Sequence, residues 1–320
     1  MHSAPCQNKH VTETPAPHPS FAKWQGSWEL SLEADGYSGN TVTAYGSALR
    51  QFASWLCQED PGISATEVTT DHLRGFIVHV RRTRSSGTAR SWFAGLRHFY
   101  RFVVGEDEMD RDPTATIKTP KPNDPQTPVL STQDLKKLLK VCQGKGFVHR
   151  RDEAILRLFI DGGLRRSELA GLQVTDIDIR DRMIFVEGKG SRRSGPRRRA
   201  VPIGVITARC LDRYLRERDR HPHADNQALW LGDRSRGPIS ADGVEAVVNR
   251  RAAEAGIEGL HLHVFRHTWA SQFRGAGGSE GDLMVLGGWR SRAMLDRYGR
   301  VEATQRAKES YRRLSLGDRL

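Results

Sequence analysis

The chain has few cysteines, no long apolar run and no internal repeat, and these absences exclude several classes of protein. Four cysteines lie far apart in 320 residues and form neither a Cys-x-x-Cys pair nor a disulfide framework. That usage is typical of a reducing, cytoplasmic setting and excludes a thiolate metal cluster. No run of about 18 apolar residues is present, so we expect no membrane span. The first 20 residues lack the apolar region of a secretory signal.

Acidic residues are also scarce relative to basic ones. The chain has 50 Lys and Arg but 38 Asp and Glu, which gives a net charge of +12 at pH 7. A basic protein of this size usually binds a polyanion, because backbone phosphates attract it independently of base sequence. A GC-rich genome would explain the choice of Arg over Lys, but not the excess over acids. The composition therefore favours nucleic acid as the partner.

The first third of the chain predicts a helical domain over residues 20–108. Residues 1–19 are aperiodic and predict a flexible tail. Apolar residues at spacings of three and four then predict four helices, over 21–34, 41–56, 71–84 and 88–104. Five prolines between residues 109 and 129 prevent a helix and favour an extended linker.

The remainder, residues 130–320, predicts a second domain that is mainly helical. Helices are expected over 131–141 and 149–161, from near Arg165, over 205–218, and from there towards the C-terminus. Between them, residues 175–190 alternate as two short strands joined at Arg180 and Asp181, and 197–203 alternate as a third. We therefore expect one small antiparallel sheet among the helices.

Two basic residues at chain breaks are the first candidates for chemistry. Arg165 follows a Gly-Gly pair near a helix start, where its guanidinium and the helix N–H groups can meet an anion. Glu168 lies on the same face and could orient it, although a surface ion pair is the commoner explanation of this spacing. Lys189 stands between two glycines at a strand end.

The loop after Lys189 is basic, with no acid as far as Arg199. A basic hairpin tip can enter a groove of DNA or follow its backbone, whereas the ordinary alternative is a solvated loop. Arginines also line the polar side of the helix predicted over 88–104. The candidates for DNA contact are Arg192, Arg193, Arg197, Arg198, Arg199, Arg90, Arg97 and Arg101.

The segment HLHVFRHTWAS combines histidines with an arginine. His263 and His267 would share one face of a helix, a spacing that can build a metal site, but such a site needs more ligands and tolerates a nearby cation poorly. Arg266 lies three residues after His263, so both can point one way from the helix. Together they suit a phosphodiester, because the imidazole can move a proton while the guanidinium neutralises oxygen charge.

Trp289 and Tyr298 follow this segment. Tyrosine can act as a nucleophile and form a covalent phosphodiester adduct, although most tyrosines at such positions are simply packed. The chain then ends in one more amphipathic segment, Val301–Leu314, which predicts a helix that docks on a partner or packs in cis.

Each feature alone is weak, but their order resembles the tyrosine recombinase, or phage integrase, family. The gaps along the series Arg165, Lys189, His263, Arg266, Trp289 and Tyr298 are 24, 74, 3, 23 and 9 residues. GLRRSEL is similar to the family's first arginine box, GKG to its hairpin lysine, and LGGW to its LGH or LGxW box. HVFRH is similar to its HxLRH box, with Phe265 where leucine is common. YSGNTVTAYGSALRQFASWL is similar to the helical core-binding domain.

The resemblance implies a fold and a mechanism. The fold would be a two-domain C-shaped clamp on DNA, with a SAM-like core-binding domain before the catalytic domain. The resemblance implies that Tyr298 attacks the DNA phosphate and forms a 3′-phosphotyrosyl bond, while His263 helps to move the tyrosine proton and Lys189 protonates the 5′-oxygen. Arg165 and Arg266 would neutralise phosphate oxygens, and Trp289 would donate a hydrogen bond to one of them. Glu168 and His267 would support the cluster. Neither a metal ion nor another cofactor such as ATP is required.

The resemblance also implies the partners. They are double-stranded DNA with a specific recombination site and three further copies of the chain, in a homotetramer whose C-terminal helix is exchanged between subunits. Trp289 replaces the usual histidine, and the hairpin is longer and more basic than in compact relatives; both features favour integration or excision of a mobile element. The alternatives are a housekeeping chromosome-resolution recombinase, a DNA-binding protein without chemistry, and a metal-dependent nuclease.

Overall fold

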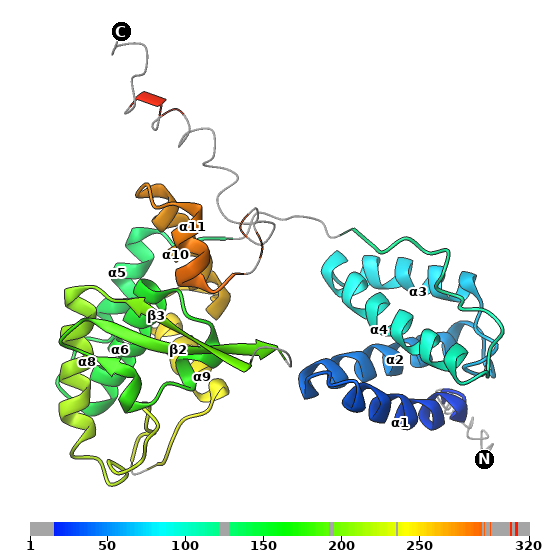
Figure 1. Ribbon diagram of the computed structural model, residues 1–320, viewed down its shortest axis with the longest axis horizontal. Coiled ribbons are helices and arrows are strands. Elements are labelled where there is room, and N and C mark those ends of the chain that lie inside the picture. The colour runs from blue at the N-terminus through cyan, green and yellow to red at the C-terminus, as the bar shows by residue number, and fades with distance from the viewer. Residues whose placement is uncertain are drawn as a thin grey trace, which may run out of the picture. The chain divides into compact units, whose positions relative to one another are not determined.

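The chain folds into two compact units. The computed structural model describes residues 16–121, 128–191, 195–234 and 236–289, together with 291, 295, 308, 311 and 312 (Figure 1). The units comprise Met1–Asp124 and Pro125–Leu320, so the division falls inside the segment predicted as a linker. No helix within the described ranges is long and apolar enough to cross a membrane.

The first unit is built from four helices, as predicted. They are α1 (Pro19–Ala34), α2 (Gly39–Glu59), α3 (Thr70–Thr83) and α4 (Ser86–Gly105). Ser38, Thr69 and Ser85 accept hydrogen bonds from backbone N–H groups in the first turns of α2, α3 and α4, which is why these helices begin there. Trp28 and Phe99 are fully buried and meet edge to face, with ring centroids 5.2 Å apart. Aromatic side chains therefore form part of the core of the first unit.

The second unit places a small sheet among helices, which confirms the predicted fold class. Its elements are α5 (Thr132–Lys140), α6 (Phe147–Gly162), α7 (Arg166–Ala170), η1 (Val174–Asp176), β1 (Ile177–Asp178), β2 (Met183–Ser191), β3 (Gly195–Pro202), α8 (Val205–Arg218), α9 (Ala241–Glu254), α10 (Leu262–Gly275) and α11 (Glu280–Gly287). The three strands are antiparallel in the order β1-β2-β3. Strands β2 and β3 form the long hairpin seen in Figure 1.

The register of this hairpin decides which side chains face inward. Val186 pairs with Arg199, and Glu187 pairs with Arg198. Directly opposite residues share one face of a sheet, and successive residues alternate between faces. Val186 is fully buried, so Arg199 lies on the inward face. Arg198 lies on the outward face beside Glu187.

A buried ion network ties α6 to α9. Asp152 is fully buried and accepts hydrogen bonds from Arg151, Arg250 and Arg251 at 2.6 to 2.9 Å. Arg251 also donates to the carbonyl of Val141 just after α5. A buried charge is tolerated only when it is paired and hydrogen-bonded. The network therefore holds α6, α9 and the end of α5 together.

Candidate active site

The turn between α6 and α7 depends on a glycine. Gly163 has φ +54°, and a Cβ there would lie 2.2 Å from the ring of Trp269. Only glycine fits both the backbone conformation and the space. The turn makes Arg165 the N-cap residue of α7. Its backbone N–H donates to Glu168 Oε2 at 2.9 Å, and its Nη1 donates to Oε1 at 2.6 Å.

Two adjacent arginines separate at this turn. Arg165 also donates from Nη2 to the carbonyl of Gly288 at 3.3 Å, and its side chain keeps 34% exposure. Arg166 turns towards α9, where it pairs with Asp242 at 3.0 Å and with Glu245. Arg165 is therefore the member of the pair that joins Glu168, and its exposed part is accessible to an anion.

Arg199 reaches the same carboxylate from β3. Its Nη1 donates to Glu168 Oε1 at 2.9 Å, and its Nη2 donates to Oε2 at 2.8 Å. Its Nε donates to the carbonyl of Leu286 on α11 at 2.9 Å. The side chain is 13% exposed. The basic run predicts Arg199 as a DNA contact, but its side chain faces inward, towards Glu168 and the end of α11.

The surroundings keep Glu168 ionised. Burial raises the pKa of its carboxyl, but the hydrogen bonds and charge of Arg199, followed by the N–H and charge of Arg165, outweigh burial and lower the pKa from 4.5 to about 2. The carboxylate is therefore a fixed anion near neutral pH. Since it faces two guanidinium groups, the cluster keeps a net positive charge.

Arg266 lies deeper in the unit than its neighbours. It is 1% exposed, its Nη1 donates to the carbonyl of Gly163 at 2.7 Å, and its Nη2 donates to the carbonyl of Gly287. Its Cζ lies 4.1 Å from the ring centroid of Trp289, a cation–π contact. His263, three residues earlier on the first turn of α10, is exposed, whereas Arg266 is buried.

Two histidines of α10 contact each other through their rings. The rings of His263 and His267 meet edge to face with centroids 4.7 Å apart. His267 is buried and His263 is exposed. No group of three or more His, Cys, Asp or Glu that could hold a metal ion occurs among the residues that the structure describes.

The C-terminal end of α11 gathers the three arginines. Three successive carbonyls each accept a hydrogen bond from a different guanidinium: Leu286 from Arg199, Gly287 from Arg266 and Gly288 from Arg165. Gly288 caps the helix with φ +63°, which turns its carbonyl towards Arg165. The last carbonyls of a helix carry partial negative charge, so cations are stabilised there. Trp289 follows at once and stacks on Trp269, with centroids 5.9 Å apart.

Several predicted residues fall partly or wholly outside the description. Lys189 lies in β2, but its side chain is not described, and the same holds for Arg197 in β3. Tyr298, Arg192, Arg193 and most of Val301–Leu314 lie outside the described residues. Their predicted roles therefore stay predictions.

The other predicted DNA-contacting arginines lie on the surface with local partners. Arg198 pairs with Asp176 at 2.9 Å and lies over the ring of Phe185. In the first unit, Arg97 donates to the carbonyl of Ile117 at 2.9 Å, Arg101 lies 4.0 Å from Asp112, and Arg90 is exposed. Arg90, Arg101 and Arg198 are exposed, and Arg97 is half-buried.

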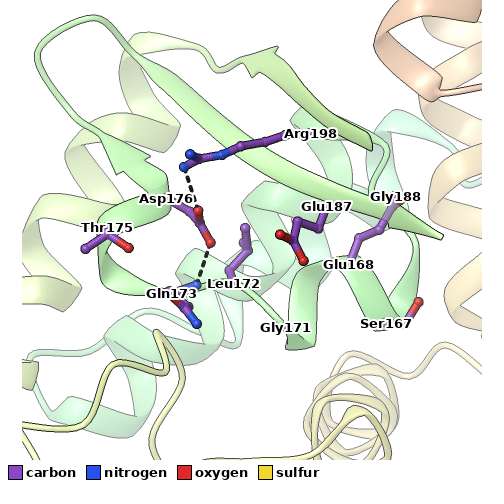
Figure 2. A pocket seen from close by; sticks show the side chains of 10 residues that line it. All are labelled: Ser167, Glu168, Gly171, Leu172, Gln173, Thr175, Asp176, Glu187, Gly188 and Arg198. Atoms are coloured by element: carbon purple, nitrogen blue, oxygen red, sulfur yellow. Dashed lines mark hydrogen bonds and ion pairs between the residues drawn. The ribbon is translucent and has the colours of Figure 1, made fainter. Parts of the chain in front are cut away.

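A pocket of about 490 Å³ lies between α7, η1 and the β2–β3 hairpin. Figure 2 shows Arg198 reaching across it from β3 to Asp176, whose carboxylate also accepts from the backbone N–H of Gln173. Glu168 lines the same pocket. The pocket therefore adjoins the carboxylate that holds Arg165 and Arg199.

Comparison with known proteins gives consistent matches. The phage integrase family profile matches residues 128–305, and the profile of the phage integrase N-terminal SAM-like domain matches residues 27–107. The tyrosine recombinase XerC 2 of Ralstonia nicotianae is 30% identical over 283 residues, which cover 85% of this chain and 79% of that protein. The tyrosine recombinase XerC of Corynebacterium efficiens is 30% identical over 288 residues, covering 87% and 86%.

Solved structures share the fold at low identity. The XerH site-specific recombinase bound to its palindromic difH substrate matches with a TM-score of 0.71 and 17% identity, over 91% of this chain and 84% of that one. The Tn1549 transposon integrase in complex with transposon right end DNA matches with a TM-score of 0.70 and 16% identity, over 91% and 99%. At this identity the likeness speaks for the fold alone.

We predict that Gly287→Ala destabilises the second unit by about 1–3 kcal/mol, because overpacking a buried site has that effect. A Cβ at Gly287 would lie 2.2 Å from the ring of Trp289, so the indole must leave its place over Arg266. Chemical unfolding followed by tryptophan fluorescence measures the change. The matched control is Gly281→Ala on the same helix, where the nearest atom is 3.7 Å away. Equal stability of the two variants would contradict the packing described above.

Proposed function

The chain belongs to the phage integrase family, the tyrosine recombinases. From this premise we propose that it is a site-specific DNA recombinase, whose catalytic residues precede and follow α11 in the sequence. Enzymes of this family cleave and rejoin DNA through a tyrosine intermediate. The proposed catalytic residues are Arg165, Lys189, His263, Arg266, Trp289 and Tyr298. The observation that carries the proposal is the convergence of Arg165 and Arg266 on the carbonyls that immediately precede Trp289.

In the proposed reaction, the Tyr298 hydroxyl attacks a DNA phosphorus and the bond from phosphorus to the 5′-oxygen breaks. A 3′-phosphotyrosyl bond forms, His263 helps to move the tyrosine proton, and Lys189 supplies a proton to the leaving oxygen. The 5′-hydroxyl of a second duplex then attacks the phosphotyrosyl bond and restores tyrosine. The number of phosphoester bonds does not change, so no ATP is needed.

The arginine cluster supplies the electrostatic part of this mechanism. Negative charge grows on the non-bridging phosphate oxygens in the transition state, and fixed cations in a site that partly excludes water stabilise it best. Arg165 offers a partly exposed guanidinium whose other contacts are fixed by Glu168 and Gly288. Arg266 adds a buried positive charge beside Trp289. Because these groups are held before DNA binds, little reorganisation is required.

We predict that the protein relaxes negatively supercoiled plasmid without a metal ion, and that Tyr298→Phe does not. Loss of the hydroxyl removes the nucleophile, so no covalent adduct forms. Gel assays with a detergent quench measure both relaxation and adduct, with EDTA present in one arm. Tyr37→Phe, a change in the first unit, serves as the matched control and is expected to behave as wild type.

Each other outcome of this assay indicates a different nucleophile or a different function for the chain. A Tyr298→Phe variant that still forms the adduct contradicts the assignment of the nucleophile. Loss of activity in EDTA indicates a metal-dependent nuclease. A wild type that binds plasmid without relaxing it indicates a DNA-binding protein that does no chemistry.

The biological role that we propose is integration or excision of a mobile element. Trp289 in the LGGW box and the long basic hairpin after Lys189 support it. A housekeeping role in chromosome resolution is the second candidate, favoured by relatives that are named XerC and XerD. The two roles share the same chemistry and differ in the DNA site.

We predict that the DNA on each side of the gene carries a recombination site built from inverted repeats, that the two sites have the same orientation, and that the protein excises the intervening segment as a circle. A plasmid bearing both flanks, followed by amplification across the expected junction, measures excision. The Tyr298→Phe variant is the control for junctions that form independently of the enzyme. If no junction forms but deletion of the gene leaves chromosome dimers unresolved, the housekeeping role is correct.

We propose a homotetramer on DNA, because recombination of two duplexes requires four strand cleavages. The amphipathic segment Val301–Leu314 would join neighbouring subunits in it. We predict that a chain ending at Arg300 binds its DNA site with lower cooperativity while each copy retains its affinity. Titration of a duplex carrying two binding sites, beside a duplex carrying one, measures both quantities. Unchanged cooperativity would mean that the segment packs within its own subunit.

A further inference from the structure

Two neighbouring arginines of β3 occupy opposite faces of the sheet. Arg198 faces outward, where its side chain is 56% exposed and pairs with Asp176. Arg199 faces inward, where its side chain is 13% exposed. In the sequence, Arg198 and Arg199 belong to the same run of basic residues. The register therefore separates a surface charge from one that belongs to the interior of the site.

Arg199 holds half of the contacts of the Glu168 carboxylate. Each carboxylate oxygen accepts one hydrogen bond from Arg165 and one from Arg199, at distances from 2.6 to 2.9 Å. The fork of Arg199 meets the two oxygens side by side, which fixes the plane of the carboxylate. Without Arg199, a buried carboxylate would keep Arg165 alone and could rotate about its side-chain bonds.

Arg199 also fixes the second support of Arg165. Its Nε donates to the Leu286 carbonyl, two residues before the Gly288 carbonyl that accepts from Arg165. The intervening Gly287 carbonyl accepts from Arg266. Arg199 therefore bonds to both supports of Arg165, which are the Glu168 carboxylate and the C-terminal end of α11. Lysine cannot replace it, because an ammonium lacks the planar fork and the separate Nε donor.

We propose that Arg199 is a positioning residue of the recombination reaction, which orients Arg165 through Glu168 and through the C-terminal carbonyls of α11. The inference rests on the proposed function. It places Arg199 outside the set that contacts DNA directly. It also links the hairpin to the site, because Arg199 pairs with Val186 on β2, the strand that carries Lys189.

The first test separates the rate of chemistry from the affinity for DNA. Arg199→Lys keeps the positive charge, so DNA affinity should stay within about twofold of wild type. The rate of plasmid relaxation at saturating protein should fall about 10- to 100-fold, the usual effect of losing a group that orients a reactive side chain. The matched control is Arg216→Gln on α8, an exposed arginine paired with Asp212, and it should leave the relaxation rate unchanged. Chemical unfolding checks that each variant is folded.

The second test uses pH, which a general loss of structure would not mimic. The groups that face Glu168 are Arg165 and Arg199, and the shared pocket adds Asp176, Glu187 and Arg198. In wild type the low pKa of Glu168 keeps it anionic as the medium is acidified. In Arg199→Gln, burial is opposed by Arg165 alone, so the pKa of Glu168 rises and the carboxylate is lost as pH falls through that value. The rate of the variant relative to wild type should therefore decline as pH falls from about 7 to about 5.

Glu168→Gln supplies the control for this pH effect. In the double variant Arg199→Gln, Glu168→Gln the additional decline at low pH should vanish, because no carboxyl remains at position 168. If Arg199→Lys relaxes plasmid as fast as wild type, the inference is wrong. It is equally wrong if Arg199→Lys and Arg199→Gln change DNA affinity alone, or if the rate of Arg199→Gln relative to wild type is constant with pH. A wild type that does not relax plasmid overturns the proposed function, and with it this premise.

Discussion

The site depends on one buried carboxylate bound by two guanidinium groups. Glu168 is removed from solvent, and an unpaired carboxylate there would be strongly destabilising. Arg165 and Arg199 both bind it, and each also donates to the end of α11. Three guanidinium groups that must lie close together would otherwise repel one another. The carboxylate and the helix-end carbonyls offset that repulsion, and they leave a net positive charge for a phosphate.

Glycine makes these carbonyls available. Gly163 and Gly288 both have positive φ, and each offers its carbonyl to a different arginine, Arg266 and Arg165. Gly287 lacks a side chain where Trp289 crosses it, so the indole can lie over Arg266. The pairs Gly162-Gly163 and Gly287-Gly288 are thus the points at which α6 and α11 end and turn carbonyls towards the arginines. A larger residue at any of the three positions would move the indole, the turn or a carbonyl.

The sequence predicted the helices and strands well and the environment of individual side chains less well. Helix α8 spans Val205–Arg218, the range that the spacing of its apolar residues predicts. Arg165 and Arg166 are adjacent in sequence, yet Arg165 contacts Glu168 while Arg166 pairs with Asp242 on α9. The basic run predicts Arg199 as one more DNA-contacting arginine, because a run of like charges does not show which members face inward. That information lies in the strand register, which one sequence does not contain. The sequence likewise does not show that Arg266 is buried while His263 is exposed, because this depends on how α10 packs.

Strand β3 couples the β2–β3 hairpin to the cluster of Glu168, Arg165 and Arg199. A strand is stiff over two residues, so Arg198 and Arg199 cannot shift independently. Arg198 ties the outward face to Asp176 across the pocket in Figure 2, and Arg199 ties the inward face to Glu168. Any displacement of the hairpin that a bound duplex imposes must therefore strain both ion pairs together. The strain reaches Arg165 directly, because Arg165 and Arg199 share each oxygen of a single carboxylate. Arg199 thus links β3 to the carboxylate and to the helix end that hold Arg165.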